Sequence, residues 1–148
     1  MSSKEYWMRR AIDLARYCHT PYAAIITDGD GKLIAQKANT VAKDLDPSAH
    51  AEINAIRKAC RIKKSVELPG CYLYATVEPC PMCASAIAWS GINNIIFGAS
   101  ISDVIEHGGK QLSFPISDFY KSMGYEAEVT PYYLRDECEE LIRQFNHA

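Results

Sequence analysis

The hydrophobic and polar positions of the chain alternate between helical and strand spacing. Between residues 4 and 18, apolar side chains recur every three or four positions with charged ones between them, which predicts an amphipathic helix. A second stripe predicts a helix with Asp46 as N-cap and Pro47 as first helical residue, running to about Arg61. A third helix, over 82–90, is apolar nearly all round, so we expect it to be buried.

Short runs rich in β-branched and aromatic residues predict the strands. These runs cover 22–27, 32–38, 71–77, 94–99 and 126–130. The first two flank the turn residues Asp28 to Gly31 and should form a hairpin. Further helical stretches are expected near 103–107 and 117–123 and over 131–145. Strands alternating with helices predict an α/β fold, a three-layer α/β/α sandwich, in one domain over 1–148.

Charge and composition narrow the partners and the compartment. Lys and Arg total 16 against 18 Asp and Glu, so no overall basic field favours nucleic acid. No apolar run reaches the roughly 18 residues of a membrane span, and the first residues lack the apolar core of a signal peptide. We therefore expect a cytoplasmic protein without membrane contact. Its six cysteines should then be reduced core residues, metal ligands or nucleophiles.

Two short segments carry candidate chemistry, and each precedes or opens a predicted helix. One is His50-Ala51-Glu52. The other is Pro79-Cys80-Pro81-Met82-Cys83. Cysteines three apart face the same way on a first helical turn, where the helix N-terminus lowers thiol pKa values. With His50 they make three ligands suited to one Zn²⁺, and three protein ligands leave a fourth position open for water. Glu52 is then the candidate base beside the metal.

Other interpretations of these residues are open at this point. Cys80 and Cys83 alone are also typical of a redox pair, and Cys60 or Cys71 could complete a closed structural zinc site. The compound pattern of H-x-E followed by P-C-x-x-C favours a catalytic zinc, because it is the signature of the zinc deaminases of nucleobases.

Over residues 21–102 the sequence resembles the cytidine and deoxycytidylate deaminase superfamily, and within it the guanine deaminases and related nucleobase deaminases. The resemblance lies in the runs from Asp46 to Arg57, Leu73 to Cys83 and Ala86 to Trp89. It implies a central five-stranded mixed sheet and a homodimer or higher oligomer. It also implies zinc on His50, Cys80 and Cys83, with Glu52 as proton shuttle.

The resemblance further implies three substrate contacts: the Asn39 side chain, the backbone amide of Ala51 and the side chain of Trp89. For Asn39, a turn-forming role at the end of a strand is the competing interpretation. Trp89 is expected to pack in the core and to border the pocket as well. Glu78 is expected to support a ligand rather than bind the metal.

The leading substrate by resemblance is guanine, converted to xanthine and ammonia. The alternatives are adenosine in a tRNA, cytosine and another aminopurine. A tryptophan at position 89 is similar to the guanine-type branch, and the acidic segment after Gly124 is unfavourable for RNA phosphates. A basic cluster over 57–64 instead favours a tRNA substrate. A small-molecule nucleobase is therefore expected rather than nucleic acid.

Two departures from the resemblance bear on the substrate. Tyr22 and Ala23 stand where the family usually has phenylalanine and glycine. Lys110 and Gln111 follow a glycine where guanine deaminases carry acidic residues, a change that removes a carboxylate able to bind guanine edges.

Overall fold

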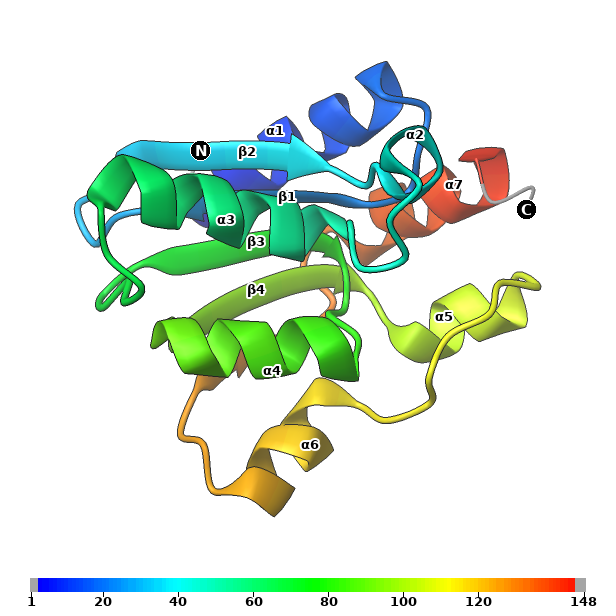
Figure 1. Ribbon diagram of the computed structural model, residues 1–148. Coiled ribbons are helices and arrows are strands. Elements are labelled where there is room, and N and C mark those ends of the chain that lie inside the picture. The colour runs from blue at the N-terminus through cyan, green and yellow to red at the C-terminus, as the bar shows by residue number, and fades with distance from the viewer. Residues whose placement is uncertain (1–2, 146–148) are drawn as a thin grey trace.

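The computed structural model describes residues 3–145, which form a five-stranded mixed sheet between helices (Figure 1). The strands are β1 (Ala23–Thr27), β2 (Leu33–Ala38), β3 (Tyr72–Val77), β4 (Asn94–Ala99) and β5 (Glu128–Thr130). Their order is β2-β1-β3-β4-β5. Strand β1 pairs antiparallel with β2 and β3, whereas β4 pairs parallel with β3 and β5. The predicted hairpin and mixed sheet are confirmed.

Helices cover both faces of the sheet (Figure 1). They are α1 (Ser3–Tyr17), α2 (Val41–Asp44), α3 (Ala51–Lys63), α4 (Pro81–Ser90), α5 (Ile101–Glu106), α6 (Ile116–Met123) and α7 (Arg135–Phe145). Helices α1 and α7 pack together on one face, while α3 and α4 lie side by side on the other with α6 against α4. This arrangement is the predicted three-layer sandwich. No helix within 3–145 is long and apolar enough to cross a membrane.

The strands separate two hydrophobic cores. In β4, Ile95 packs towards α3 and α4, whereas Ile96 packs towards α1 and α7. In β1, Ile26 packs in the same core as Ile95, and Ile25 packs in the same core as Ile96. Successive side chains of a strand point to opposite faces, so a strand covered on both faces has a continuous apolar sequence.

The predicted start of the second helix is wrong. Helix α3 begins at Ala51 with His50 as N-cap, and the Asp46 carboxylate instead accepts hydrogen bonds from the backbone N–H and hydroxyl of Ser48, at 2.8 and 2.7 Å. Asp46 therefore stabilises a turn before the helix, a role that aspartate fills as readily as that of N-cap. As a consequence, His50 and Glu52 flank the very first residue of α3.

Helix α4 follows its predicted bounds, and Gly91 ends it in the left-handed conformation at φ 79°. The expectation that it is buried all round is wrong. Ala84 and Ile87 point into the core, but Trp89 is 83% exposed. Two residues beyond Ile87, a side chain lies on nearly the opposite side of a helix, so the register turns the tryptophan outwards.

A buried ion pair joins the start of α5 to α7. Asp103 and Ser100 form a reciprocal capping box, in which each backbone N–H donates to the other side chain, at 3.0 and 2.9 Å. Arg135 donates two hydrogen bonds to the same carboxylate, at 2.8 and 3.0 Å, and the Asp103 side chain is only 1% exposed. Burial disfavours the charged carboxylate, but these hydrogen bonds outweigh it and lower the pKa of Asp103 to about 2.

We expect Asp103→Asn to lower the free energy of unfolding by about 2–3 kcal/mol at pH 7, because charge-assisted hydrogen bonds and a helix cap are lost. Since the folded state lowers the pKa, the stabilisation by Asp103 is present above about pH 4 and declines as pH falls towards 2. Urea unfolding across that range measures both effects. Glu140→Gln, which removes an exposed pair with Arg143, is the control and should change stability by less than about 0.5 kcal/mol. A difference between Asp103→Asn and wild type that stays constant from pH 7 to 2 would contradict the assignment.

Candidate active site

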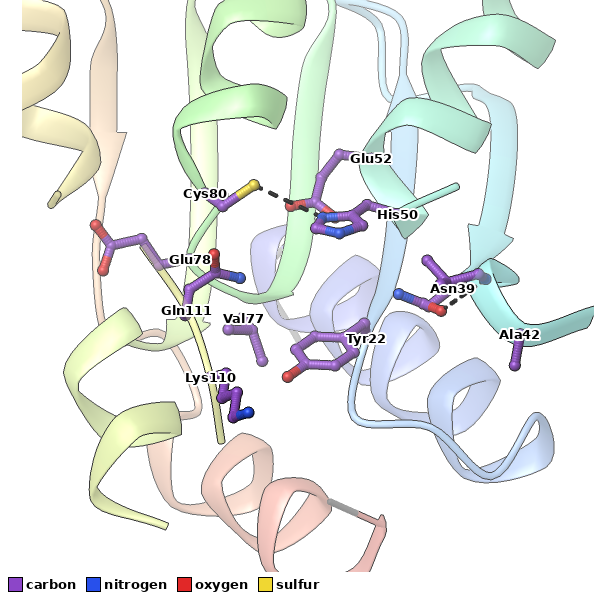
Figure 2. Close-up of a pocket in the computed structure, with 11 residues that line it drawn as sticks. Tyr22, Asn39, Ala42, His50, Glu52, Val77, Glu78, Cys80, Lys110 and Gln111 are labelled. Atoms are coloured by element: carbon purple, nitrogen blue, oxygen red, sulfur yellow. Dashed lines mark hydrogen bonds between the residues drawn. The ribbon is translucent and has the colours of Figure 1, made fainter. Parts of the chain in front are cut away.

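His50, Cys80 and Cys83 converge where α3 and α4 begin (Figure 2 shows His50 and Cys80). His50 and Cys80 are the N-caps of the two helices, and neither side chain caps its own helix. Proline at the first position of α4 has no N–H that would need an acceptor, so it suits the start of this helix. The Nδ1 atom of His50 lies 3.6 Å from each of the two Sγ atoms, and the three ligand atoms lie within 4.8 Å of one another.

The separations fit a tetrahedral zinc ion. With Zn–S bonds of about 2.3 Å, Zn–N bonds of about 2.05 Å and tetrahedral angles, a ligand nitrogen and sulfur lie about 3.6 Å apart. Both Nδ1–Sγ distances match this value. One imidazole and two thiols are also the donor types that zinc prefers. His50, Cys80 and Cys83 therefore fit zinc without rearrangement.

The charges at the site also favour a cation. The pKa of Cys80 is lowered to about 4, because the Cys83 thiol and the His50 ring hydrogen-bond to its thiolate. The pKa of Cys83 is raised, because its proton is held in the hydrogen bond to Cys80. Beside them, Glu52 is buried, and burial together with the charge of Cys80 raises its pKa to about 7. A bound cation would relieve the mutual repulsion of these acidic groups.

A cavity of about 350 Å³ opens onto these residues (Figure 2). It is lined by Tyr22, Asn39, Val41, Ala42, His50, Glu52, Val77, Glu78, Cys80, Lys110 and Gln111. Its size is within the range of small-molecule sites, and its lining combines apolar walls with a few polar groups. His50, Cys80 and Glu52 form one end of this cavity.

Asn39 fits both interpretations of the sequence. Its carboxamide oxygen accepts a hydrogen bond from the backbone N–H of Val41, at 3.0 Å, as a turn-forming asparagine does. Its carboxamide nitrogen points towards the cavity in Figure 2. The turn contact thus fixes the orientation of the amide and leaves its nitrogen as a donor to the cavity.

The other two predicted substrate contacts differ in position. The backbone amide of Ala51 is the first of α3 and therefore has no acceptor within the helix, so contact with a substrate stays a prediction. Trp89 is not among the residues lining the cavity, and the expectation that it packs in the core is wrong. It lies near the C-terminal end of α4, whereas the cavity is at the N-terminal end.

Sequence reasoning missed several lining residues, notably Val41, Ala42 and Val77. Three further lining residues stand out in the sequence only because they differ from the residues usual in the family, and these are Tyr22, Lys110 and Gln111. Glu78 does not join the metal-ligating group: its two carboxylate oxygens accept hydrogen bonds from the backbone N–H groups of Ile101 and Ile116, at 3.0 and 2.7 Å.

Comparison with known proteins agrees with this geometry. Residues 1–99 match the model of the cytidine and deoxycytidylate deaminase zinc-binding region. The chain belongs to this family. It is a deaminase, and zinc is the metal that His50, Cys80 and Cys83 would hold.

Two kinds of relative are about equally similar to this deaminase. The guanine deaminase of Bacillus subtilis is 38% identical over 138 residues, which cover 87% of this chain and 83% of the relative. The tRNA-specific adenosine deaminase of Aquifex aeolicus is 36% identical over 146 residues, covering 96% and 93%. A structure of guanine deaminase from Nitrosomonas europaea superimposes with a TM-score of 0.82 at 28% identity, over 95% of this chain and 83% of that one. The resemblance to the superfamily is confirmed, and the substrate is left unresolved.

We expect Cys83→Ala to weaken zinc binding by more than about a hundredfold, since even residues that merely support a ligand contribute up to that factor. Competition with a chelating dye and metal analysis of the purified variant measure the loss. Cys60→Ala is the matched control, because Cys60 is a half-buried free thiol outside the metal-ligating group. Stoichiometric zinc of wild-type affinity in Cys83→Ala would exclude this ligand set.

Proposed function

We propose that this deaminase hydrolyses the exocyclic C–N bond of a free nucleobase or related amino-heterocycle, with guanine as the first compound to test. The cavity carries this proposal: about 350 Å³ bounded by Lys110 and Gln111 on one side and Asn39 on the other suits a small flat ring beside Glu52. The similarity to a guanine deaminase over most of both chains supports the same choice.

The chain's own residues supply the proton transfers of such a reaction. Zinc, when bound, supplies a Lewis acid that lowers the pKa of water at its open position. Glu52 then takes a proton from the attacking water and delivers it to the ring nitrogen beside the attacked carbon. Attack of the water oxygen on that carbon forms the C–O bond. Glu52 then takes the second proton from the new hydroxyl and gives it to the amino group, so that the carbonyl forms, the C–N bond breaks and ammonia leaves. The Asn39 amide nitrogen orients the ring through one of its acceptor atoms.

The second candidate is a tRNA adenosine deaminase, which the relative from Aquifex aeolicus favours. The basic cluster over 57–64 would be its phosphate contact. That cluster occupies the C-terminal half of α3, and Lys63 is 13 residues from His50, or about 20 Å along the helix. Arg57 in addition faces Asp46, at 3.8 Å. The acidic segment after Gly124, which is unfavourable for RNA phosphates, supports the free base over RNA.

We expect the zinc-loaded protein to release ammonia from at least one free amino-heterocycle and to be much less active on an anticodon stem-loop. The panel comprises guanine, cytosine, adenine, their nucleosides and the stem-loop, and a coupled assay measures the ammonia. A clear preference for the stem-loop would replace the proposal with the tRNA alternative. No release from any compound would overturn it in favour of a zinc-stabilised binding domain.

Glu52→Gln is the variant that assigns the chemistry. It keeps the shape of the side chain and removes its basicity, so we expect zinc content to be retained and kcat to fall by about a hundredfold or more. Metal analysis and kcat on the best substrate of the panel are the two readouts. Substantial turnover by zinc-loaded Glu52→Gln would show that another group moves the proton.

We further propose that the protein is a homodimer, as the family resemblance implies. Support comes from large apolar side chains exposed at one end of α4. Trp89 is 83% exposed and Val66 is 80% exposed. The backbone N–H of Leu68 donates to the carbonyl of Ser90, at 2.7 Å, which brings the segment containing Val66 to the end of α4. Exposed apolar groups gathered in this way are typical of an interface.

Trp89→Glu should convert such a dimer to a monomer, because a charge would then be buried at the centre of the apolar contact. Sedimentation velocity measures the change. Tyr17→Glu is the control: Tyr17 is 84% exposed at the end of α1, on the opposite face of the sheet, and the variant should sediment like wild type. A wild-type protein that stays monomeric at high concentration would contradict the dimer.

A further inference from the structure

The side of the cavity opposite Asn39 is formed by the segment between α5 and α6. Figure 2 shows Lys110 and Gln111 there, across the cavity from Asn39, with Tyr22 between them. None of these side chains belongs to the metal-ligating group or to the proton transfers assigned to Glu52. Their chemistry is therefore available to recognise the part of a substrate that does not react.

Glu78 binds the first residue of each of the two helices that flank this segment. One carboxylate oxygen accepts from the backbone N–H of Ile101, the first residue of α5, and the other from that of Ile116, the first residue of α6. The segment also returns to α5 through a hydrogen bond from the Gly109 N–H to the Val104 carbonyl, at 2.9 Å. The segment that carries Lys110 is therefore tied to α5 immediately before the lysine and to Glu78 at its far end, where α6 begins.

The positive charge of Lys110 is not neutralised within the described part of the chain. None of the ion pairs found among residues 3–145 includes it. The cavity has two carboxylates, and both serve other groups: Glu78 accepts from two backbone amides, and Glu52 lies at the metal end beside His50. Lys110 is exposed, so water solvates its ammonium group in the free protein, and a negatively charged group of a ligand in the cavity would pair with it.

The groups near Lys110 also favour a ligand that accepts hydrogen bonds. An ammonium group only donates, and so does the amide nitrogen of Asn39, which is the end of that side chain that faces the cavity. The Tyr22 hydroxyl and the Gln111 amide are able to donate as well. An acidic residue, as guanine deaminases carry at the Lys110 position by the resemblance above, accepts from a ring N–H. Lys110 donates instead, so this position favours a ligand atom that accepts a hydrogen bond.

We propose that Lys110 determines specificity, and that the substrate is an amino-heterocycle with an anionic group, a carboxylate or a phosphate, on the edge away from the reacting amino group. The inference rests on the proposed deaminase function and refines its substrate class. Guanine then serves as a neutral reference compound. Lys110 acts in binding and takes no part in the proton transfers at the reacting carbon.

The test compares neutral amino-heterocycles with charged derivatives of the same ring. Cytosine is paired with its 5-carboxylate, cytidine with its 5′-monophosphate, and guanine is included as the neutral purine. We expect at least one charged compound to exceed its neutral parent about tenfold or more in kcat/KM, through KM rather than kcat, and the ratio to fall as salt is added. The two pairs distinguish a ring carboxylate from a phosphate ester.

Lys110→Glu should abolish or reverse the preference, Lys110→Ala should remove most of it and Lys110→Arg should retain it. The matched control is Lys43→Glu, which makes the same charge change on an exposed residue of α2, the helix whose residues Val41 and Ala42 line the cavity. It should leave the ratio as in wild type. An unchanged ratio in Lys110→Glu, or a wild-type preference for the neutral compounds, would overturn the inference.

A binding measurement separates this inference from the proposed function. Calorimetric titration of the charged and neutral compounds into zinc-loaded Glu52→Gln, with and without Lys110→Glu, reports affinity without turnover. Ammonia release with no charge preference would refute the role of Lys110 and leave the deaminase proposal standing. Charge-dependent binding with no ammonia release from any compound would refute the deaminase proposal and leave the role of Lys110 standing. Tightest binding of an anticodon stem-loop, lost in Lys110→Glu, would assign the lysine to RNA phosphate instead.

Discussion

The site depends on two helices that start at the same edge of the sheet. Helix α3 comes after β2 and the short α2, α4 follows β3, and each begins at the residue after a metal ligand. The first turn of a helix has amide groups without partners and a partial positive charge, which stabilises thiolates and carboxylates placed beside it. His50, Cys80, Cys83 and Glu52 all lie within three residues of a helix start. The helix starts offset only part of the cost of burial, since the pKa values of Glu52 and Cys83 are still raised, and a bound cation would offset the rest.

The same edge of the sheet also carries the recognition side of the cavity, by a different physical device. The carboxylate of Glu78, which is 6% exposed, sits two residues before Cys80 and binds the first backbone amides of α5 and α6. A buried carboxylate is stable there because both of its oxygens accept hydrogen bonds at helix N-termini. One strand end thus positions a zinc ligand and, through Glu78, the segment that carries Lys110. The reacting end and the recognising end of the cavity are mechanically linked.

The separation along the chain of the residues that interact explains which features were predictable from the sequence and which were not. The zinc ligands were predictable because their geometry is local: Cys80 and Cys83 share one turn, and each ligand segment opens a helix. The strands were predictable because strands buried on both faces have continuous apolar sequences, whereas the five-stranded mixed sheet was implied by the family resemblance. The start of α3 was not predictable, because an aspartate such as Asp46 stabilises a turn as readily as it caps a helix. Trp89 was misplaced because an apolar sequence all around α4 does not indicate which side meets the sheet.

Lys110 shows why substrate specificity is harder to derive than chemistry. Its position over the cavity depends on hydrogen bonds between Glu78 and residues 23 and 38 positions away, which no local spacing reveals. The reaction demands particular ligand types in a fixed geometry, and the hydrolysis of an amino group is the same reaction on a base and on a tRNA adenosine. Recognition of the rest of the substrate demands only complementary charge and hydrogen bonding, which a single substitution on a surface segment changes. Two families of relatives at 38% and 36% identity are therefore compatible with one catalytic site and with different substrates.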